Sequence, residues 1–209
     1  YSGKAVPLAL GGDGNITLPL LRAASKAHSD LVVVHIDAHT DTYRGDGNQD
    51  YMRFNVATTF TRAAEEALID VESSIHVGAR GPTNDSGVFN HTRDVGYGLI
   101  DGTELFNAGL RNTAKNIVES LKGRSVYLCF DMDFFDPSCA PGVCTPTWGG
   151  ATSREGLDFL QNLTGLNLVG ADINTVSPPH DISGMTAFLA ATVGLEILSV
   201  ICHSKGLVE

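Results

Sequence analysis

Residues 31–41 read Leu31-Val32-Val33-Val34-His35-Ile36-Asp37-Ala38-His39-Thr40-Asp41. This apolar run, which ends in alternating acidic and imidazole side chains, is the strongest indication of the fold class. Residues two apart on a strand point to the same side, so Asp37, His39 and Asp41 are predicted to share one face. A second run, 126–130, ends in the same way at Asp131-Met132-Asp133. Four carboxylates and an imidazole at one pole of a sheet repel one another unless cations lie among them. The sequence therefore predicts a metal site, with two ions as the first interpretation.

Short apolar runs alternate with helical patterns along the rest of the chain. We predict strands over residues 6–10, 31–36, 74–77, 95–100, 126–130 and 166–173. We predict helices over residues 18–28, 57–68, 103–121, 153–163 and 186–202. This order is typical of an α/β fold, a three-layer αβα sandwich with a mainly parallel sheet. Ligands gather beyond the carboxyl ends of such strands, where both acidic clusters fall.

Length and composition limit the classes of function. A chain of 209 residues with 43% hydrophobic and 18% charged residues fits a single globular domain over 1–209. A net charge of −10 argues against a nucleic-acid partner, which needs clustered Lys and Arg. We expect no membrane span, because no run approaches the required length. Four cysteines without a C-x-x-C pair favour a reducing, cytoplasmic location.

Each acidic cluster also has an ordinary structural interpretation. A single Asp after a strand is usually a turn or helix-cap residue. Three donors at alternate positions, together with a second Asp-x-Asp, are much harder to explain in that way. Oxygen-rich ligation with an imidazole suits Mn²⁺ or another divalent first-row ion better than structural zinc. His35 is placed one face away from the cluster and is expected to be a hydrogen-bonded core histidine.

Two loops follow predicted strands and could shape the mouth of a site. Residues 136–146 contain three prolines and a glycine, which would fix a rigid loop, although an ordinary connection has the same composition. Residues 177–181, Ser-Pro-Pro-His-Asp, permit the same two interpretations, and His180 is our candidate there for substrate binding. The glycine-rich segment 11–15 lacks the spacing of a nucleotide-binding loop.

Taken in order, these segments resemble the ureohydrolase family, which includes arginases, agmatinases and guanidinases. The similar segments are 11–13, 37–41, 130–137, 172–181 and 186–198. The agmatinase-like branch is the most similar, as in His-Ile-Asp-Ala-His-Thr-Asp-Thr at 35–42. The resemblance implies an arginase-like fold and two divalent ions, most often manganese, with nickel as the alternative. It implies hydrolysis of a small cationic guanidino compound to urea and an amine or ammonia, by a homo-oligomer (a trimer or hexamer).

The resemblance also assigns roles to the clustered residues. Asp37 and Asp131 would bridge the two ions and form the catalytic centre. His39 and Asp133 would complete the ligands of one ion, and Asp41 would bind the other.

Three positions depart from the family's pattern. Gly14 stands where family members usually have a histidine that binds metal. Val56 stands where a His-Gly-Thr segment often places a proton-carrying histidine. Thr175 replaces the glutamate that commonly holds the guanidinium, and its hydroxyl could bind a small compound such as guanidine. The N-terminal third of a typical member also has no counterpart before Tyr1, so the chain is expected to lack that segment.

These observations support hypotheses from different classes. The first is a metal-dependent hydrolase of a guanidino (amidino) compound with a shifted substrate. The alternative is a catalytically silent relative with a binding or assembly role. A third is hydrolysis of another C–N bond, such as that of a formimino group.

Overall fold

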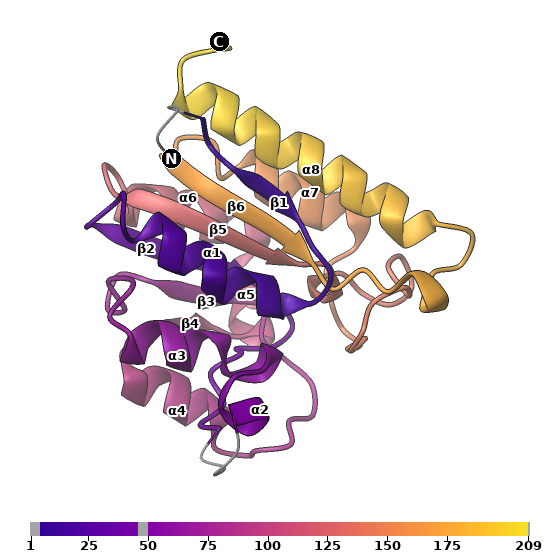
Figure 1. The fold of residues 1–209 in the computed structure, drawn as a ribbon. Coiled ribbons are helices and arrows are strands. Elements are labelled where there is room, and N and C mark those ends of the chain that lie inside the picture. The colour runs from indigo at the N-terminus through magenta and orange to yellow at the C-terminus, as the bar shows by residue number, and fades with distance from the viewer. Residues whose placement is uncertain (1–4, 46–49, 209) are drawn as a thin grey trace.

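The computed structural model describes residues 5–45 and 50–208, and its centre is a six-stranded sheet (Figure 1). The strands are β1 (Leu8–Leu10), β2 (Leu31–Ile36), β3 (Ile75–Val77), β4 (Gly98–Ile100), β5 (Ser125–Asp131) and β6 (Leu168–Asn174). Their order is β1-β6-β5-β2-β3-β4, and every adjacent pair is parallel. The carboxyl ends of all six strands therefore lie at one edge, as the sequence predicted.

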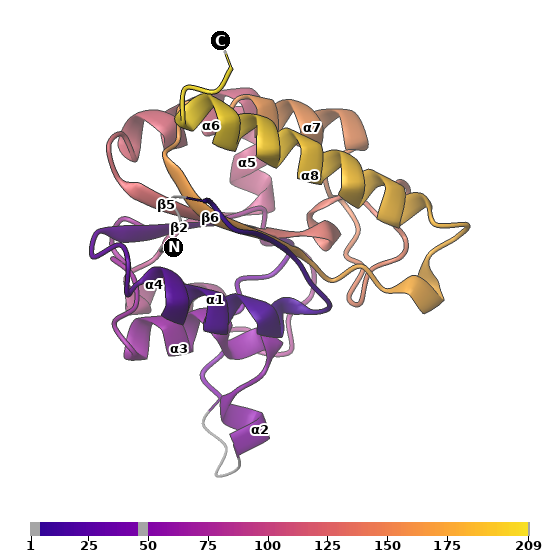
Figure 2. The ribbon, with the colours of Figure 1, turned by 45° about the horizontal axis from the view of Figure 1, so that its top comes forward.

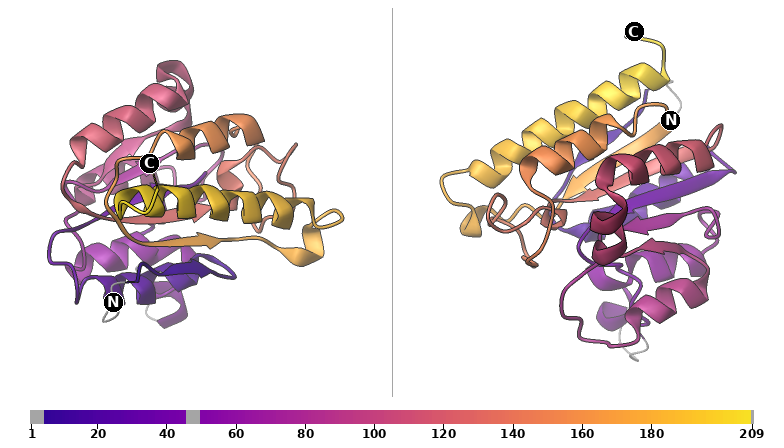
Figure 3. Two further views of the ribbon diagram at one scale, coloured as in Figure 1. Left: turned by 90° about the horizontal axis from the view of Figure 1, so that it is seen from above. Right: turned by 180° about the vertical axis from the view of Figure 1, so that it is seen from behind.

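Helices cover both faces of the sheet (Figures 2 and 3). The α-helices are α1 (Thr17–Ala24), α2 (Asp50–Arg53), α3 (Thr59–Glu65), α4 (Val88–Val95), α5 (Gly102–Ala108), α6 (Leu110–Ser120), α7 (Ser153–Gln161) and α8 (Met185–Ser204). The 3-10 turns are η1 (Gly14–Ile16), η2 (Val56–Thr58), η3 (Met132–Phe134) and η4 (Pro178–His180). In Figure 2, α1, α3 and α4 lie on one side, and α5, α6, α7 and α8 lie on the other.

Two hydrophobic cores result from the alternation of side chains along the strands. Val32, Val34 and Ile36 of β2 pack in the core beneath α6, α7 and α8. Leu31 and Val33 of the same strand pack in the other core, with α1 and α3. Strand β2 is thus buried on both faces, which confirms the predicted αβα sandwich.

The predicted elements differ from the observed ones mainly on the side of the sheet that ends in β4. The predicted strand 95–100 is shorter, because residue 95 ends α4, a helix that the sequence analysis did not predict. The predicted helix 103–121 is two helices, α5 and α6. They part at Gly109, whose φ of 84° is a left-handed conformation that glycine adopts without strain.

Helix α8 corrects the expectation that no segment is long enough for a membrane span. By length and composition alone, its 20 residues are apolar enough to cross a bilayer. The run was missed because a glycine and a glutamate interrupt it, at Gly194 and Glu196. In the fold α8 packs against β6 and α7, with Val193 and Ile197 buried in the core, and a core helix passes the same test.

Candidate metal centre

The two acidic clusters meet where β2 and β5 end side by side. The register pairs His35 with Cys129 and Ile36 with Phe130, so Asp37, directly after β2, lies next to Asp131, the last residue of β5. The side chains of Asp37, Asp131 and Asp133 are all buried. A parallel neighbour therefore brings together residues that are about ninety positions apart in the sequence.

His39 and Asp133 form the most closely connected part of the cluster. Nδ1 of His39 lies 3.0 Å from Oδ2 of Asp133 and 3.3 Å from Oδ1 of Asp37. Asp133 also accepts hydrogen bonds from the Ala38 amide, at 3.0 Å, and from the Thr145 hydroxyl, at 3.0 Å. These bonds fix both carboxylate oxygens of Asp133 before any ligand binds.

Local turns orient the two carboxylates at the strand ends. Oδ1 of Asp37 accepts the amide of His39 at 2.6 Å, and Oδ1 of Asp131 accepts the amide of Asp133 at 2.7 Å. Both are bonds to the amide two residues on, which Asp favours where a strand gives way to a turn. Asp37 and Asp131 therefore stabilise turns and are at the same time candidate metal ligands.

The electrostatics of the cluster match a cation-binding site. Burial and then the neighbouring carboxylates raise the pKa values of Asp37, Asp41 and Asp131 well above the usual range. Burial acts in the opposite direction on His39, but hydrogen bonds to Asp133 and Asp37 raise its pKa to about 11. Burial likewise opposes the shift at Asp133, where the hydrogen bond from His39 lowers the pKa to about 2. The buried carboxylates thus repel one another, and positive charge relieves that repulsion.

Asp41 lies at the open side of the cluster and is half-buried. Its backbone φ of 50° is a left-handed conformation that Asp tolerates better than most residues. Together with His39 it borders a cavity of about 640 Å³. The cavity is lined by His39, Asp41, Tyr43, Gly45, Met52, Asn55, Val56, Ala57, Thr58, Pro82, Asn84 and Thr145.

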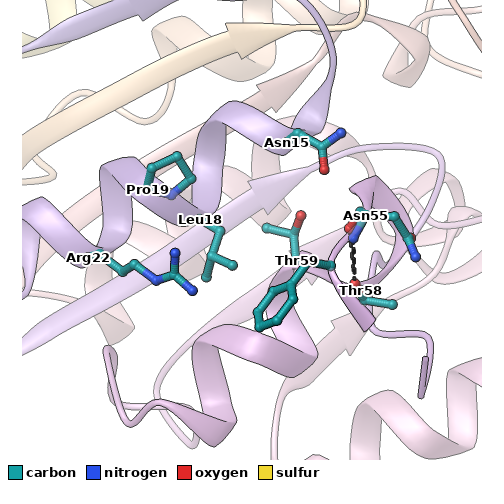
Figure 4. A pocket seen from close by; sticks show the side chains of 8 residues that line it. Asn15, Leu18, Pro19, Arg22, Asn55, Thr58 and Thr59 are labelled. Carbon is teal, nitrogen blue, oxygen red and sulfur yellow. Dashed lines mark hydrogen bonds between the residues drawn. The ribbon is translucent and has the colours of Figure 1, made fainter. Parts of the chain in front are cut away.

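A separate hollow of about 270 Å³ lies between α1 and the start of α3 (Figure 4). Leu18, Pro19 and Arg22 of α1 face Asn55 and Thr59 across it. None of the five metal candidates borders this hollow, so it is not the candidate site.

His35 is buried, and its position corrects one expectation. Its Nε2 lies 2.9 Å from Oδ2 of Asp37, so the histidine is on the cluster's side of the strand and not one face away. Its Nδ1 lies 2.8 Å from Nδ1 of the buried His76. The expected hydrogen-bonded core histidine is confirmed. Residues two apart on a strand share a side, so this contact follows from the strand's period.

The two candidates for substrate binding lie at the end of β6, outside the residues that line the cavity. The hydroxyl of the buried Thr175 donates to Oδ1 of Asp131. His180 is exposed, and its Nδ1 lies 2.7 Å from the Ser177 hydroxyl. The neighbouring Asp181 accepts the amides of Thr186 and Ala187 at the start of α8.

Arg80 supports the site and was missed by the sequence analysis. One of its terminal nitrogens donates to the carbonyls of Asp133 and Thr147, both at 2.8 Å. Arg80 thereby ties the end of β5 to the loop that contains Thr145 and Thr147. No local sequence pattern could reveal these bonds, because they join backbone atoms more than fifty residues away.

The cluster contains two groups of side chains that can hold a divalent metal ion. One is Asp37, His39 and Asp133, and the other is His35, Asp37 and Asp41. Within each group the ligand atoms lie within 4.8 Å of one another. The donors are oxygen-rich with one imidazole each, which suits a first-row divalent ion.

Comparison with known proteins gives a consistent result. The profile of the Arginase family matches residues 1–199. Guanidinobutyrase from Pseudomonas aeruginosa is 38% identical over 199 residues, which are 94% of this chain and 60% of that protein. An agmatinase from Neisseria meningitidis serogroup C is 39% identical over 197 residues, again 94% of this chain and 60% of the agmatinase.

Solved structures agree with the sequence comparison. The proclavaminate amidino hydrolase of Streptomyces clavuligerus superposes with a TM-score of 0.87 at 37% identity, over 94% of this chain and 64% of that one. The chain spans about 60% of the length of the curated relatives given above. The profile match covers nearly all of it, and the chain belongs to the arginase family.

Proposed function

We propose that this chain is a metal-dependent hydrolase of a guanidino (amidino) compound, releasing urea and an amine or ammonia. The observation that supports this most directly is the preformed group of Asp37, His39 and Asp133 beside a cavity of about 640 Å³. The names of its relatives, guanidinobutyrase and agmatinase, point to the same class of substrate.

The proposed ion-binding residues are Asp37, His39, Asp131 and Asp133, with Asp41 as the further ligand that a second ion would need. Manganese is the ion we propose, and nickel is the alternative. A bound divalent ion would lower the pKa of a water molecule and stabilise charge at the guanidinium carbon. Thr145 and the Ala38 amide hold Asp133 in place, and Asp41 places a carboxyl group at the cavity, whose charged form a bound cation would favour. Water adds to the guanidinium carbon, the C–N bond breaks, and the nitrogen leaves protonated.

We further propose that residues 1–209 form a single domain of a cytoplasmic homo-oligomer, a trimer or hexamer. We keep Thr175 and His180 as candidate substrate contacts, which would form in the oligomer or once substrate is bound. The one continuous sheet with a core on each face supports the single domain.

Urea release from a panel of guanidino compounds tests the function. The purified protein is loaded with Mn²⁺ or Ni²⁺ and given guanidine, methylguanidine, agmatine and 4-guanidinobutyrate. We expect release from at least one, and loss of that release in Asp131→Asn. Asp158→Asn is the matched control, because Asp158 pairs with Arg111 at the surface, away from the cluster. Protein with bound metal that releases urea from none of these compounds contradicts the proposal.

A catalytically silent relative is the second candidate, and one observation favours it. Gly14 lies beside Asp41 and Val56 lies beside Gly14, and neither offers a side chain that could bind metal or carry a proton. Such a protein would bind guanidino compounds without turning them over. Binding measured by calorimetry, in a preparation that releases no urea over many hours, would identify it.

A further inference from the structure

The side chain of Asp41 differs from the other carboxylates of the cluster, because among the described residues it has no hydrogen-bond donor. Asp37, Asp131 and Asp133 each accept a backbone amide or a hydroxyl. Within residues 5–45 and 50–208, no donor reaches the carboxylate of Asp41. It borders the cavity instead. An unpartnered carboxylate in a partly buried position needs a cation.

On the side of Gly14, the surroundings of Asp41 supply no ligand for a second metal ion. A Cβ atom placed on Gly14 would lie 3.5 Å from Oδ2 of Asp41 and 3.8 Å from Cβ of Val56. On this side Gly14 lies beside Asp41, and the aliphatic side chain of Val56 lies beside Gly14.

The imidazole that shares a group of possible metal ligands with Asp41 is that of His35, and this ring already makes other contacts. Both nitrogens of His35 have partners, Asp37 at 2.9 Å and His76 at 2.8 Å. An ion beside Asp41 would thus depend on carboxylates shared with the first ion, without a free imidazole.

The cavity favours an organic cation at this position. Asp41 is its one acidic side chain among the described lining residues, and the other polar side chains are the uncharged Tyr43, Asn55, Thr58, Asn84 and Thr145, besides His39. A guanidinium is planar and presents parallel N–H donors that match the two oxygens of a carboxylate. Thr175 is not among the residues that line this cavity, and its hydroxyl donates to Asp131.

We infer that Asp41 binds the guanidinium of the substrate and not a second metal ion, so that the centre works with one ion held by Asp37, His39, Asp131 and Asp133. This inference rests on the proposed function, whose substrate class it uses. It makes Asp41 the residue that positions the guanidinium carbon beside the ion-binding group.

Metal counting and ligand binding in two variants test the inference. Metal per chain is measured by mass spectrometry after gel filtration in Mn²⁺, and methylguanidinium binding is measured by calorimetry. We expect one ion per chain in the wild type and in Asp41→Asn, and a loss of at least about tenfold in methylguanidinium affinity in Asp41→Asn. Asp158→Asn should match the wild type in both measurements.

Gly14→His is the complementary variant, because the contacts around a Cβ at this position are ordinary van der Waals distances. The new imidazole should recruit Asp41 to a second ion, giving two ions per chain and methylguanidinium binding weakened by about tenfold or more.

Three results would overturn the inference: two ions in the wild type, loss of an ion in Asp41→Asn, or no methylguanidinium binding by the wild type. Failure of the proposed function has a different signature. It is the absence of urea release while one ion and Asp41-dependent methylguanidinium binding are both observed.

Discussion

The two sides of the metal-binding cluster differ in how well hydrogen bonds support them, although both use residues that follow β2. On one side, His39 and Asp133 lie 3.0 Å apart, and hydrogen bonds from a backbone amide and from Thr145 fix the carboxylate. On the other, Asp41 lies beside Gly14, which has no side chain to support it. Alternating Asp and His residues thus bring charged side chains together at one place, whereas the surrounding hydrogen bonds decide which of these side chains are oriented to bind a metal ion.

Removing a ligand from the supported side should have the largest effect. In Asp133→Asn the carboxylate that pairs with His39 becomes a neutral amide. We expect Mn²⁺ affinity to fall by more than about 100-fold, the upper end of what loss of an outer partner costs. Isothermal calorimetry with Mn²⁺ measures it, with Asp158→Asn as the control. An affinity within a few-fold of wild type would mean that the supported side is not the metal site.

The stability of the metal-free protein should show how strongly the carboxylates on both sides repel one another. The pKa values of Asp37, Asp41 and Asp131 are raised, so folding retains protons that the unfolded chain releases above about pH 4. His39 acts in the same direction between about 6.5, its unfolded value, and its folded pKa of about 11. Burial lowers the pKa of His35 to about 3 and also lowers that of His76, and these two groups act in the opposite direction only below about 6.5, their unfolded value. The free energy of unfolding should therefore fall as pH rises from 7 to 9, by about 1.4 kcal/mol per pH unit for each retained proton.

Urea denaturation of chelator-treated protein at pH 7 and pH 9 measures this fall. The lowered pKa of Asp133 does not oppose it, because that contribution is lost only as pH falls towards about 2. Adding Mn²⁺ should remove most of the dependence, since bound metal replaces the protons. Metal-free protein that is equally stable at both pH values would show that the carboxylates do not interact as described.

A variant of Arg80 tests whether its bonds to backbone carbonyls help to position Asp133. Arg80→Met removes the donor for the carbonyls of Asp133 and Thr147 and leaves these oxygens without it. We expect the free energy of unfolding to fall by about 2–3 kcal/mol, and Mn²⁺ affinity to fall by about tenfold. Arg111→Met is the matched control, because Arg111 is mostly exposed. If both variants behave alike, Arg80 has no special role in positioning Asp133.

The sequence could predict the features of the cluster that depend on local patterns, but not those that depend on contacts between distant segments. The apolar runs predicted the core strands, and the period of two placed Asp37, His39 and Asp41 together, because both are local patterns. Arg80 and Thr145 were missed, because their partners lie on distant segments that only the fold brings near. Helix α4 was missed because its sequence is largely polar.

The position of Thr175 shows the same limit at a single residue. Its place after β6 could be predicted from the sequence, but the direction of its hydroxyl could not. That direction depends on a backbone φ of 67° and on the neighbouring Asp131.

The smallest predicted effect distinguishes two threonines of one loop. The hydroxyl of Thr145 donates to Oδ2 of Asp133 at 3.0 Å, whereas that of Thr147 lies 3.5 Å from Nε2 of His39, at the limit of a hydrogen bond. Thr145→Val keeps the shape of the side chain and removes the donor, so Mn²⁺ affinity should fall by about tenfold, the lower end for an outer partner. Thr147→Val should change it by less than about threefold, within the ordinary variation of such measurements. The same Mn²⁺ titration measures both variants, and equal losses would mean that the loop supports the metal group through its backbone and not through the hydroxyl of Thr145.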